Sequence, residues 1–184
     1  MQADNLYTCT RTTRGGLVFR KWFVSAAEPV YPSCTDTVPT GRFQVLPGRP
    51  TVILDVAHNP HAASALAQNL GNMGFHPFTY AVFGVMQDKD IAGVVAPMAA
   101  HVDHWCLAAL PSPRSASTDE LVGIIDELSP EDGKPGERSI KTFADPGAAY
   151  ADAMSRAGEN DRIVVFGSFY TVAGVMAARK PSHH

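Results

Sequence analysis

Short runs of apolar residues alternate along this chain with longer segments in which apolar positions recur every three or four residues. The short runs are rich in β-branched side chains, as expected of buried parallel strands. They predict strands over residues 51–56, 78–85, 102–110, 140–143 and 162–166. The longer segments have helical spacing. They predict helices that begin near residues 60, 90, 117, 145 and 168.

This alternation of strand and helix predicts one class of fold. We expect an α/β domain with a Rossmann-like, mostly parallel sheet of about five or six strands and helices on both faces, because short connections between apolar strands leave both faces to be covered. Ligands of such sheets bind beyond the carboxyl ends of the strands. The loops that follow predicted strands are therefore candidates for a site: residues 55–60, 84–90, 111–117 and 167–171.

Residues 1–39 lack this regularity, and within them only residues 16–24 are predicted as a strand. We therefore divide the chain into three parts. Residues 1–39 are interpreted as an irregular N-terminal arm, either a remnant of upstream sequence or a non-native segment. Residues 40–180 are expected to form the α/β domain, and residues 181–184 a tail. The pair His183-His184 in that tail is interpreted as the remnant of a purification tag.

The composition fits one globular domain: 184 residues, 45% hydrophobic and 18% charged, with a net charge of −3 and a pI of about 6.1. These values argue against nucleic acids or acidic membranes as partners, and no apolar stretch approaches the ~20 residues of a membrane-spanning helix. Cys9, Cys34 and Cys106 include no pair at CxxC spacing, so a zinc or redox motif is unsupported. An odd number of cysteines fits a reducing compartment, so we expect a cytoplasmic protein. We also expect it to be a monomer.

The segment after the first predicted strand of the domain contains Asp55, His58 and Asn59, followed by Pro60. A carboxylate at the end of a buried strand needs a partner, and in this position it can bind ribose hydroxyls or a cation. A histidine can transfer a proton or bind an anion near neutral pH. The alternative is that Asp55 and Asn59 are only turn and cap residues and that His58 is an exposed loop residue.

The segment after the last predicted strand, residues 167–171, turns from Gly167 and Ser168 into a helix. The N–H groups at such a helix start attract carboxylates and phosphates. The alternative is an ordinary helix start with Ser168 as its N-cap. Because the segment has no G-x-S-x-G pattern, it does not favour a serine hydrolase.

Basic residues lie near the same predicted edge of the sheet. Lys89 can neutralise a substrate carboxylate or phosphate, and Arg114 can bind an anion through two N–H groups. The alternative for Lys89 is a solvated helix start with paired surface charges, and the alternative for Arg114 is a surface loop. Arg42 precedes the first strand of the domain and means little by itself. The sequence contains neither G-x-x-x-x-G-K-[ST] nor G-x-G-x-x-G, so it has no recognisable triphosphate-binding loop.

Taken in order, these motifs resemble the C-terminal domain of the bacterial bifunctional dihydrofolate synthase/folylpolyglutamate synthase family, in the Mur ligase superfamily. The resemblance covers about residues 40–178. The segments that carry it are GRFQ at 41–44, DVAHNPHAA at 55–63, FGVM and DKDIAG between 83 and 93, PR at 113–114 and FGSFYTV at 166–172. The wording DVAHNP favours this branch over the Mur peptidoglycan ligases, which usually carry DYAH or a similar variant there.

The resemblance implies an ATP-dependent, ADP-forming ligase of folate biosynthesis. In that family a pterin-linked carboxylate is activated as an acyl phosphate, and the amine of L-glutamate attacks it. The resemblance implies that Arg42 and Asp55 contact ATP and that His58 is the catalytic residue. The residues that it implies for substrate binding are Ser168, Lys89 and Asn59. The phosphate loop, the Mg²⁺ ligands and the pteroate pocket of the family belong to an N-terminal domain, so no metal site is expected on this chain.

Residues 1–39 do not resemble that N-terminal domain. We therefore expect the chain alone to be inactive and to bind nucleotide weakly, with ATP, L-glutamate and dihydropteroate or folate reaching it through the missing domain. Two other interpretations remain open: a Mur-type ligase domain that adds an amino acid to a cell-wall nucleotide, and a stand-alone Rossmann-like binding module. A flavodoxin-like or receiver-like domain is not supported, because neither a phosphate-binding loop nor an acidic cluster follows the first strand.

Overall fold

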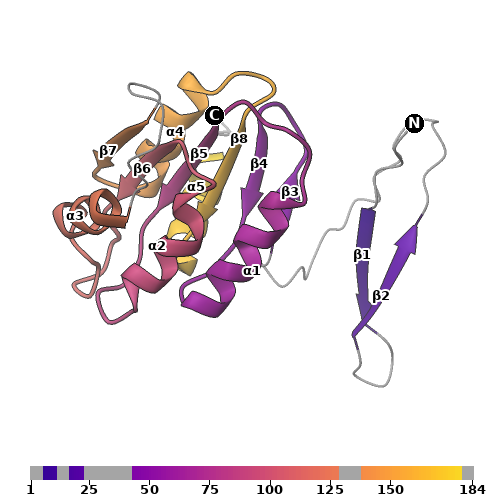
Figure 1. The fold of residues 1–184 in the computed structure, drawn as a ribbon, viewed down its shortest axis with the longest axis horizontal. Helices are drawn as coiled ribbons and strands as arrows, with labels where there is room; N and C mark the ends of the chain where they lie inside the picture. Colours follow the sequence, from indigo (N-terminus) through magenta and orange to yellow (C-terminus); the bar gives the residue numbers. More distant parts are fainter. Residues whose placement is uncertain (1–5, 12–16, 23–42, 129–137, 180–184) are drawn as a thin grey trace. The chain divides into compact units, whose positions relative to one another are not determined.

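The computed structural model describes residues 6–11, 17–22, 43–128 and 138–179. The chain divides into two compact units, Met1–Val38 and Pro39–His184. In the first unit, β1 (Leu6–Arg11) pairs with β2 (Leu17–Trp22) in an antiparallel ladder (Figure 1). The strand predicted over residues 16–24 corresponds to β2, whereas the sequence pattern predicts no strand at β1.

The second unit is built on a six-stranded sheet with the order β3-β4-β8-β5-β6-β7. Its strands are β3 (Gln44–Leu46), β4 (Thr51–Leu54), β5 (Thr79–Phe83), β6 (His104–Ala108), β7 (Ser139–Phe143) and β8 (Arg162–Phe166). Only β3, at one edge, pairs antiparallel; the other neighbours in this sheet are parallel. The predicted fold class, an α/β unit with a mostly parallel sheet, is confirmed.

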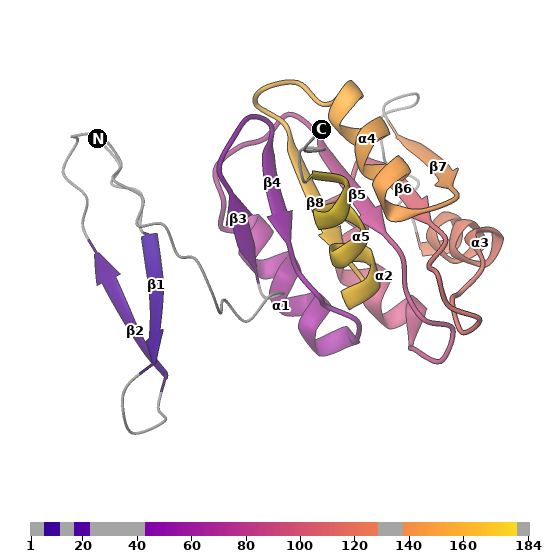
Figure 2. The same ribbon diagram turned by 180° about the vertical axis from the view of Figure 1, so that it is seen from behind.

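Helices cover both faces of this sheet. They are α1 (Pro60–Gly71), α2 (Ile91–Ala99), α3 (Thr118–Leu128), α4 (Pro146–Arg156) and α5 (Phe169–Arg179). Figure 1 shows α1, α2 and α3 in front of the sheet, and Figure 2 shows α4 and α5 on the opposite side. The first helix, α1, ends at Gly71, with Asn72 as its C-cap, three residues before the glycine at position 74. Because Asn72 donates its N–H to carbonyls of the last turn, the helix is closed before Gly74 is reached.

Neighbouring positions on each strand supply two separate cores. Ile53, Phe83 and Phe166 pack under α1, α2 and α3, whereas Leu54 and Val165 pack under α4 and α5. Successive side chains of a strand point to opposite faces, so a strand covered on both sides must be apolar at every position. This is why the strands appear in the sequence as unbroken apolar runs. No helix in the described part of the chain is long and apolar enough to cross a lipid bilayer.

Candidate functional site

The candidate site lies at the carboxyl edge of the sheet, where three neighbouring parallel strands end. The strands β4, β8 and β5 lie side by side in that order (Figure 2). They lead into Asp55, Gly167 and Gly84, respectively. Because parallel strands finish at the same edge, the structure brings together the loops of residues 55–60, 84–90 and 167–171, as the sequence predicts.

The carboxylate of Asp55 is buried, with 9% of the residue exposed. Its two oxygens accept hydrogen bonds from the backbone N–H groups of Phe43 and Ala57, each at 2.8 Å. Phe43 has a φ of 41°, which non-glycine residues rarely adopt. Through these two hydrogen bonds, Asp55 connects the segment before β3 with the turn after β4. Arg42, the other residue predicted to contact ATP, precedes Phe43 and lies outside the described residues.

His58 is exposed, and its Nδ1 lies 2.8 Å from the carbonyl oxygen of Val56. A carbonyl can only accept, so Nδ1 carries the hydrogen in this contact. In the neutral ring, Nε2 then carries the lone pair. The local turn thus orients the imidazole and leaves one nitrogen as a potential proton acceptor.

Asn59 is the N-cap of α1. Its side-chain oxygen accepts the N–H of Ala62 at 2.9 Å, and its backbone carbonyl accepts the N–H of Ala63 at 3.0 Å. The capping role considered for this residue is therefore confirmed. Its contact with substrate stays a prediction.

Gly167 and Ser168 form the turn from β8 into α5. Gly167 has a φ of 104°, a region that favours glycine. Ser168 is only 7% exposed, and its Oγ accepts the N–H of Tyr170 at 3.2 Å. Ser168 therefore stabilises the first turn of α5 from a position next to the end of β4. This agrees with the N-cap alternative and leaves the substrate contact of Ser168 untested.

Lys89 and Arg114 converge on Asp88, a residue that the sequence does not single out as part of a site. Their distances to Oδ2 of Asp88 are 3.2 Å from Lys89 Nζ and 3.1 Å from Arg114 Nη2. The hydrogen bond from Lys89 has the largest effect and lowers the pKa of the Asp88 carboxyl; burial raises it by less, and the hydrogen bond from Arg114 lowers it further. The backbones are joined as well, because Gln87 N–H donates to the Arg114 carbonyl at 2.8 Å. A substrate anion would thus compete with Asp88 for these two cations.

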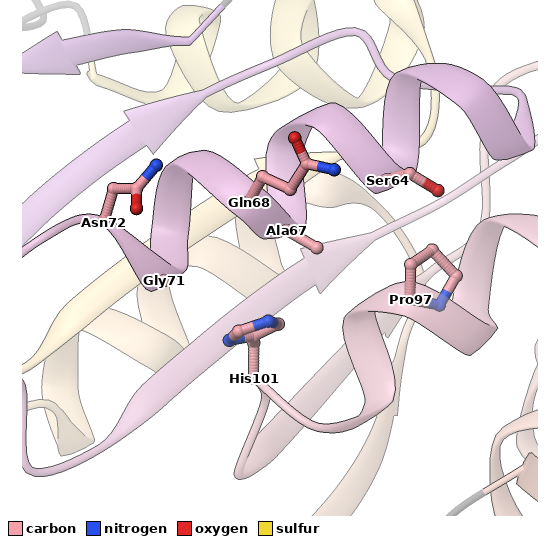
Figure 3. Close-up of a pocket in the computed structure, with 7 residues that line it drawn as sticks. All are labelled: Ser64, Ala67, Gln68, Gly71, Asn72, Pro97 and His101. Atoms are coloured by element: carbon pink, nitrogen blue, oxygen red, sulfur yellow. The ribbon is translucent and has the colours of Figure 1, made fainter.

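Two cavities on the surface of the second unit differ in their position relative to the candidate site. One of about 530 Å³ lies in the groove between the C-terminal halves of α1 and α2, away from the carboxyl edge (Figure 3). Its lining residues are Ser64, Ala67, Gln68, Gly71, Asn72, Pro97 and His101. Another, of about 300 Å³, opens at the carboxyl edge between the loops after β6 and β7 and the start of α5, where Tyr170 and Leu110 contribute to its wall. Only the smaller cavity adjoins the candidate site.

No group of three or more His, Cys, Asp or Glu side chains in the described part of the chain is arranged to hold a metal ion. The carboxyl edge offers a fixed carboxylate, an oriented imidazole and two basic side chains. These groups can bind parts of an anionic substrate and a nucleotide ribose.

Comparison with known families assigns the class of this protein, the glutamate ligase domain of Mur ligases. The family described as "Mur ligase, glutamate ligase domain" matches residues 41–169, and the chain belongs to this family. The dihydrofolate synthase/folylpolyglutamate synthase of Escherichia coli strain K12 is 39% identical over 136 residues, which are 74% of this chain and 29% of that protein. The resemblance predicted from the sequence is confirmed.

Solved structures agree with this assignment. Escherichia coli FolC in complex with DHPP and ADP superposes with a TM-score of 0.66 and 38% identity, over 74% of this chain and 30% of that one. A bifunctional folylpolyglutamate synthase/dihydrofolate synthase with Mn, AMPPNP and L-glutamate bound gives 0.64 and 42%, over 77% and 32%. The chain thus spans about 30% of the length of the relatives it matches.

Proposed function

We propose that residues 40–180 form the C-terminal α/β part of an ATP-dependent, ADP-forming ligase that adds L-glutamate to dihydropteroate or folates. One observation carries this proposal: the loops that contain Asp55, His58 and Ser168 follow the adjacent parallel strands β4 and β8, so they lie together at the carboxyl edge of the sheet. It is supported by 42% identity to a synthase structure that holds Mn, AMPPNP and L-glutamate.

Each side chain has a task in this reaction. The buried carboxylate of Asp55, together with Arg42, binds the nucleotide; a fixed carboxylate can accept from ribose hydroxyls without having to be ordered first. Ser168 and the α5 N-terminus receive a carboxylate of the incoming glutamate. Lys89 exchanges its contact with Asp88 for the same substrate.

His58 is the proposed catalytic residue. The amine of glutamate attacks the carbonyl carbon of the acyl phosphate, the bond from that carbon to the phosphate oxygen breaks, and inorganic phosphate leaves. The nitrogen must lose a proton to become an amide nitrogen. Nε2 of His58 is the nitrogen free of the Val56 contact, and it accepts this proton.

The described residues fit only part of an ATP site. Asp55 suits the ribose, but the sequence has no triphosphate loop, and no described cluster of side chains suits Mg²⁺. We propose that a companion domain supplies both groups and that the chain alone does not turn over ATP. We further propose a cytoplasmic monomer. We also propose that it has no nucleic-acid or membrane partners, which agrees with its net charge of −3.

A chimera tests the proposal. The matching C-terminal segment of the Escherichia coli relative would be replaced by residues 39–184, the second compact unit. We expect the chimera to form ADP only when both dihydropteroate and L-glutamate are present, and the 184-residue chain to form none. ADP formation with UDP-muramyl substrates instead would favour a Mur-type cell-wall ligase. An inactive but folded chimera would contradict the proposed function.

A further inference from the structure

Three closely packed residues connect the carboxyl ends of β5 and β8 next to the candidate site. Thr171, in the first turn of α5, is fully buried, and its hydroxyl donates to the carbonyl oxygen of Gly84 at 2.7 Å. Gly84 directly follows β5, and Gly167 directly follows β8. We name Gly84, Gly167 and Thr171 the glycine joint.

The joint begins where the sheet stops. The ladder between β5 and β8 ends at the pair Phe83 and Phe166, and Gly167 then turns away with a φ of 104°. The next carbonyl along the chain after β5, that of Gly84, is instead bound by a side chain, the hydroxyl of Thr171. This hydroxyl therefore extends the connection between the two strands by one residue beyond their backbone pairing.

The glycine joint leaves no space for a side chain at either of its glycines. A Cβ on Gly167 would lie 2.6 Å from the Gly84 oxygen, and a Cβ on Gly84 would lie 2.8 Å from the Ala108 oxygen and 3.2 Å from the Thr171 hydroxyl. The separations of 2.6 Å and 2.8 Å from backbone oxygens are closer than a side-chain carbon atom tolerates, and the separation of 3.2 Å from the Thr171 hydroxyl is tighter than usual. The ends of β5, β6 and β8 are thus packed directly against one another, with Thr171 as the polar contact among them.

We propose that Thr171 is a positioning residue of the ligase site. Its bond to the Gly84 carbonyl fixes the turn at Ser168 relative to the loop of residues 84–90, which carries Lys89. The carboxylate of the incoming amino acid can contact both Ser168 and Lys89 only if the distance between these two segments is fixed. This inference rests on the proposed function, because that function assigns the carboxylate to Ser168 and Lys89.

The first test needs only the full 184-residue chain. Thr171→Val keeps the shape of the side chain and removes the donor, whereas Thr171→Ser keeps the donor. Thr79→Val is the control, because it removes another buried threonine hydroxyl, which accepts from Arg162 Nε at 2.8 Å. Thr79 lies at the amino end of β5, whereas Gly84 follows the carboxyl end of that strand. We expect Thr171→Val to speed amide hydrogen exchange at Gly84 and residues 168–170 by about tenfold or more beyond the effect of Thr79→Val.

The second test is kinetic and uses the chimera. We expect Thr171→Val to raise the KM for L-glutamate about tenfold, Thr171→Ser to restore it, and Thr79→Val to leave it within about twofold of the unsubstituted value. An unchanged KM for L-glutamate, or faster exchange spread evenly over the sheet, would overturn the positioning role. An inactive unsubstituted chimera would contradict the proposed function instead, and the exchange comparison would still decide whether Thr171 fixes the turn.

Discussion

Gly167 is the residue at which the site depends most directly on backbone conformation. Its φ of 104° and the 2.6 Å separation between an added Cβ and the Gly84 oxygen act together against any side chain. We expect Gly167→Ala to lower the free energy of unfolding by about 2–4 kcal/mol, since strained φ and a backbone clash each cost on the order of 1–3 kcal/mol. Urea denaturation of the purified chain measures this change.

Gly123 provides the matched control for that substitution. It lies inside α3, and a Cβ there would meet nothing within 4 Å. Gly123→Ala should therefore raise the free energy of unfolding by about 0.5–1 kcal/mol, because alanine is the better helix former. If both substitutions stabilised the chain, the close packing described for the glycine joint would be wrong.

Individual site residues were predictable from the sequence only in part. Asp55, Asn59 and Ser168 stand at strand ends and helix starts, and the pattern places them there. The partners of Asp55 were not predictable, because one of them is the N–H of Phe43 in an unusual backbone conformation. For Lys89, the alternative of paired surface charges agrees with its contact to Asp88, whereas the approach of Arg114 to the same carboxylate depends on how its loop packs and was not predictable.

At the scale of elements, the amino edge of the sheet should respond to pH through His104. Its ring lies 5.4 Å from that of Phe78 and 4.5 Å from that of Tyr80, and its Nδ1 is 3.0 Å from Ser139 Oγ. Burial first, and then the charge of Arg156, lower the pKa of this imidazole, with a smaller lowering by Lys141; Asp103 and Asp161 oppose the shift. The folded chain therefore favours neutral His104.

The sign of the pH dependence follows from this shift. Below the unfolded pKa of about 6.5, the unfolded chain binds a proton that the folded chain resists, so stability falls as the pH falls. His101 has its pKa lowered by burial too and acts in the same direction. We expect the free energy of unfolding to decrease between about pH 7 and pH 5. In urea titrations across this range, His104→Gln should flatten the decrease; an unchanged slope would contradict the assignment to His104.

Elements with strong periodicity were the ones that the sequence predicted well. The strand predicted over residues 162–166 matches β8, and each helix of the second unit starts within one residue of its predicted position. β3 was missed because it has only three residues and begins with the polar Gln44, so no apolar run marks it. β1 was missed for a related reason: its residues include Thr8, Cys9 and Thr10 and show no regular alternation.

At the scale of the whole unit, exposed aromatic side chains gather at the carboxyl edge. Phe169 and Tyr170 begin α5 directly after Ser168, and they are 59% and 47% exposed. Tyr170 also lines the 300 Å³ cavity with Leu110 and Pro111. The proposed reaction passes through an acyl phosphate, which must be kept from water. A companion domain that closes over the proposed site would therefore cover these side chains.

Replacement of Phe169 and Tyr170 distinguishes an effect on closure of the companion domain from an effect on folding. We expect Phe169→Ser combined with Tyr170→Ser to lower ligase activity of the chimera by about tenfold or more, since aromatic side chains often contribute most of the free energy of an interface. The free energy of unfolding of the 184-residue chain should change by less than about 1 kcal/mol, because exposed side chains contribute little to it. Steady-state ADP formation and urea denaturation measure the two quantities.

Phe75 is the control for a general loss of exposed apolar surface. It is 92% exposed and lies between α1 and β5, at the opposite edge of the sheet from Ser168. Phe75→Ser should leave chimera activity within about twofold of the unsubstituted value. Equal losses for Phe75→Ser and for the paired substitution would show that aromatic surface matters only for solubility or folding. A loss confined to Phe169 and Tyr170 would instead identify the carboxyl edge as the surface over which the companion domain closes.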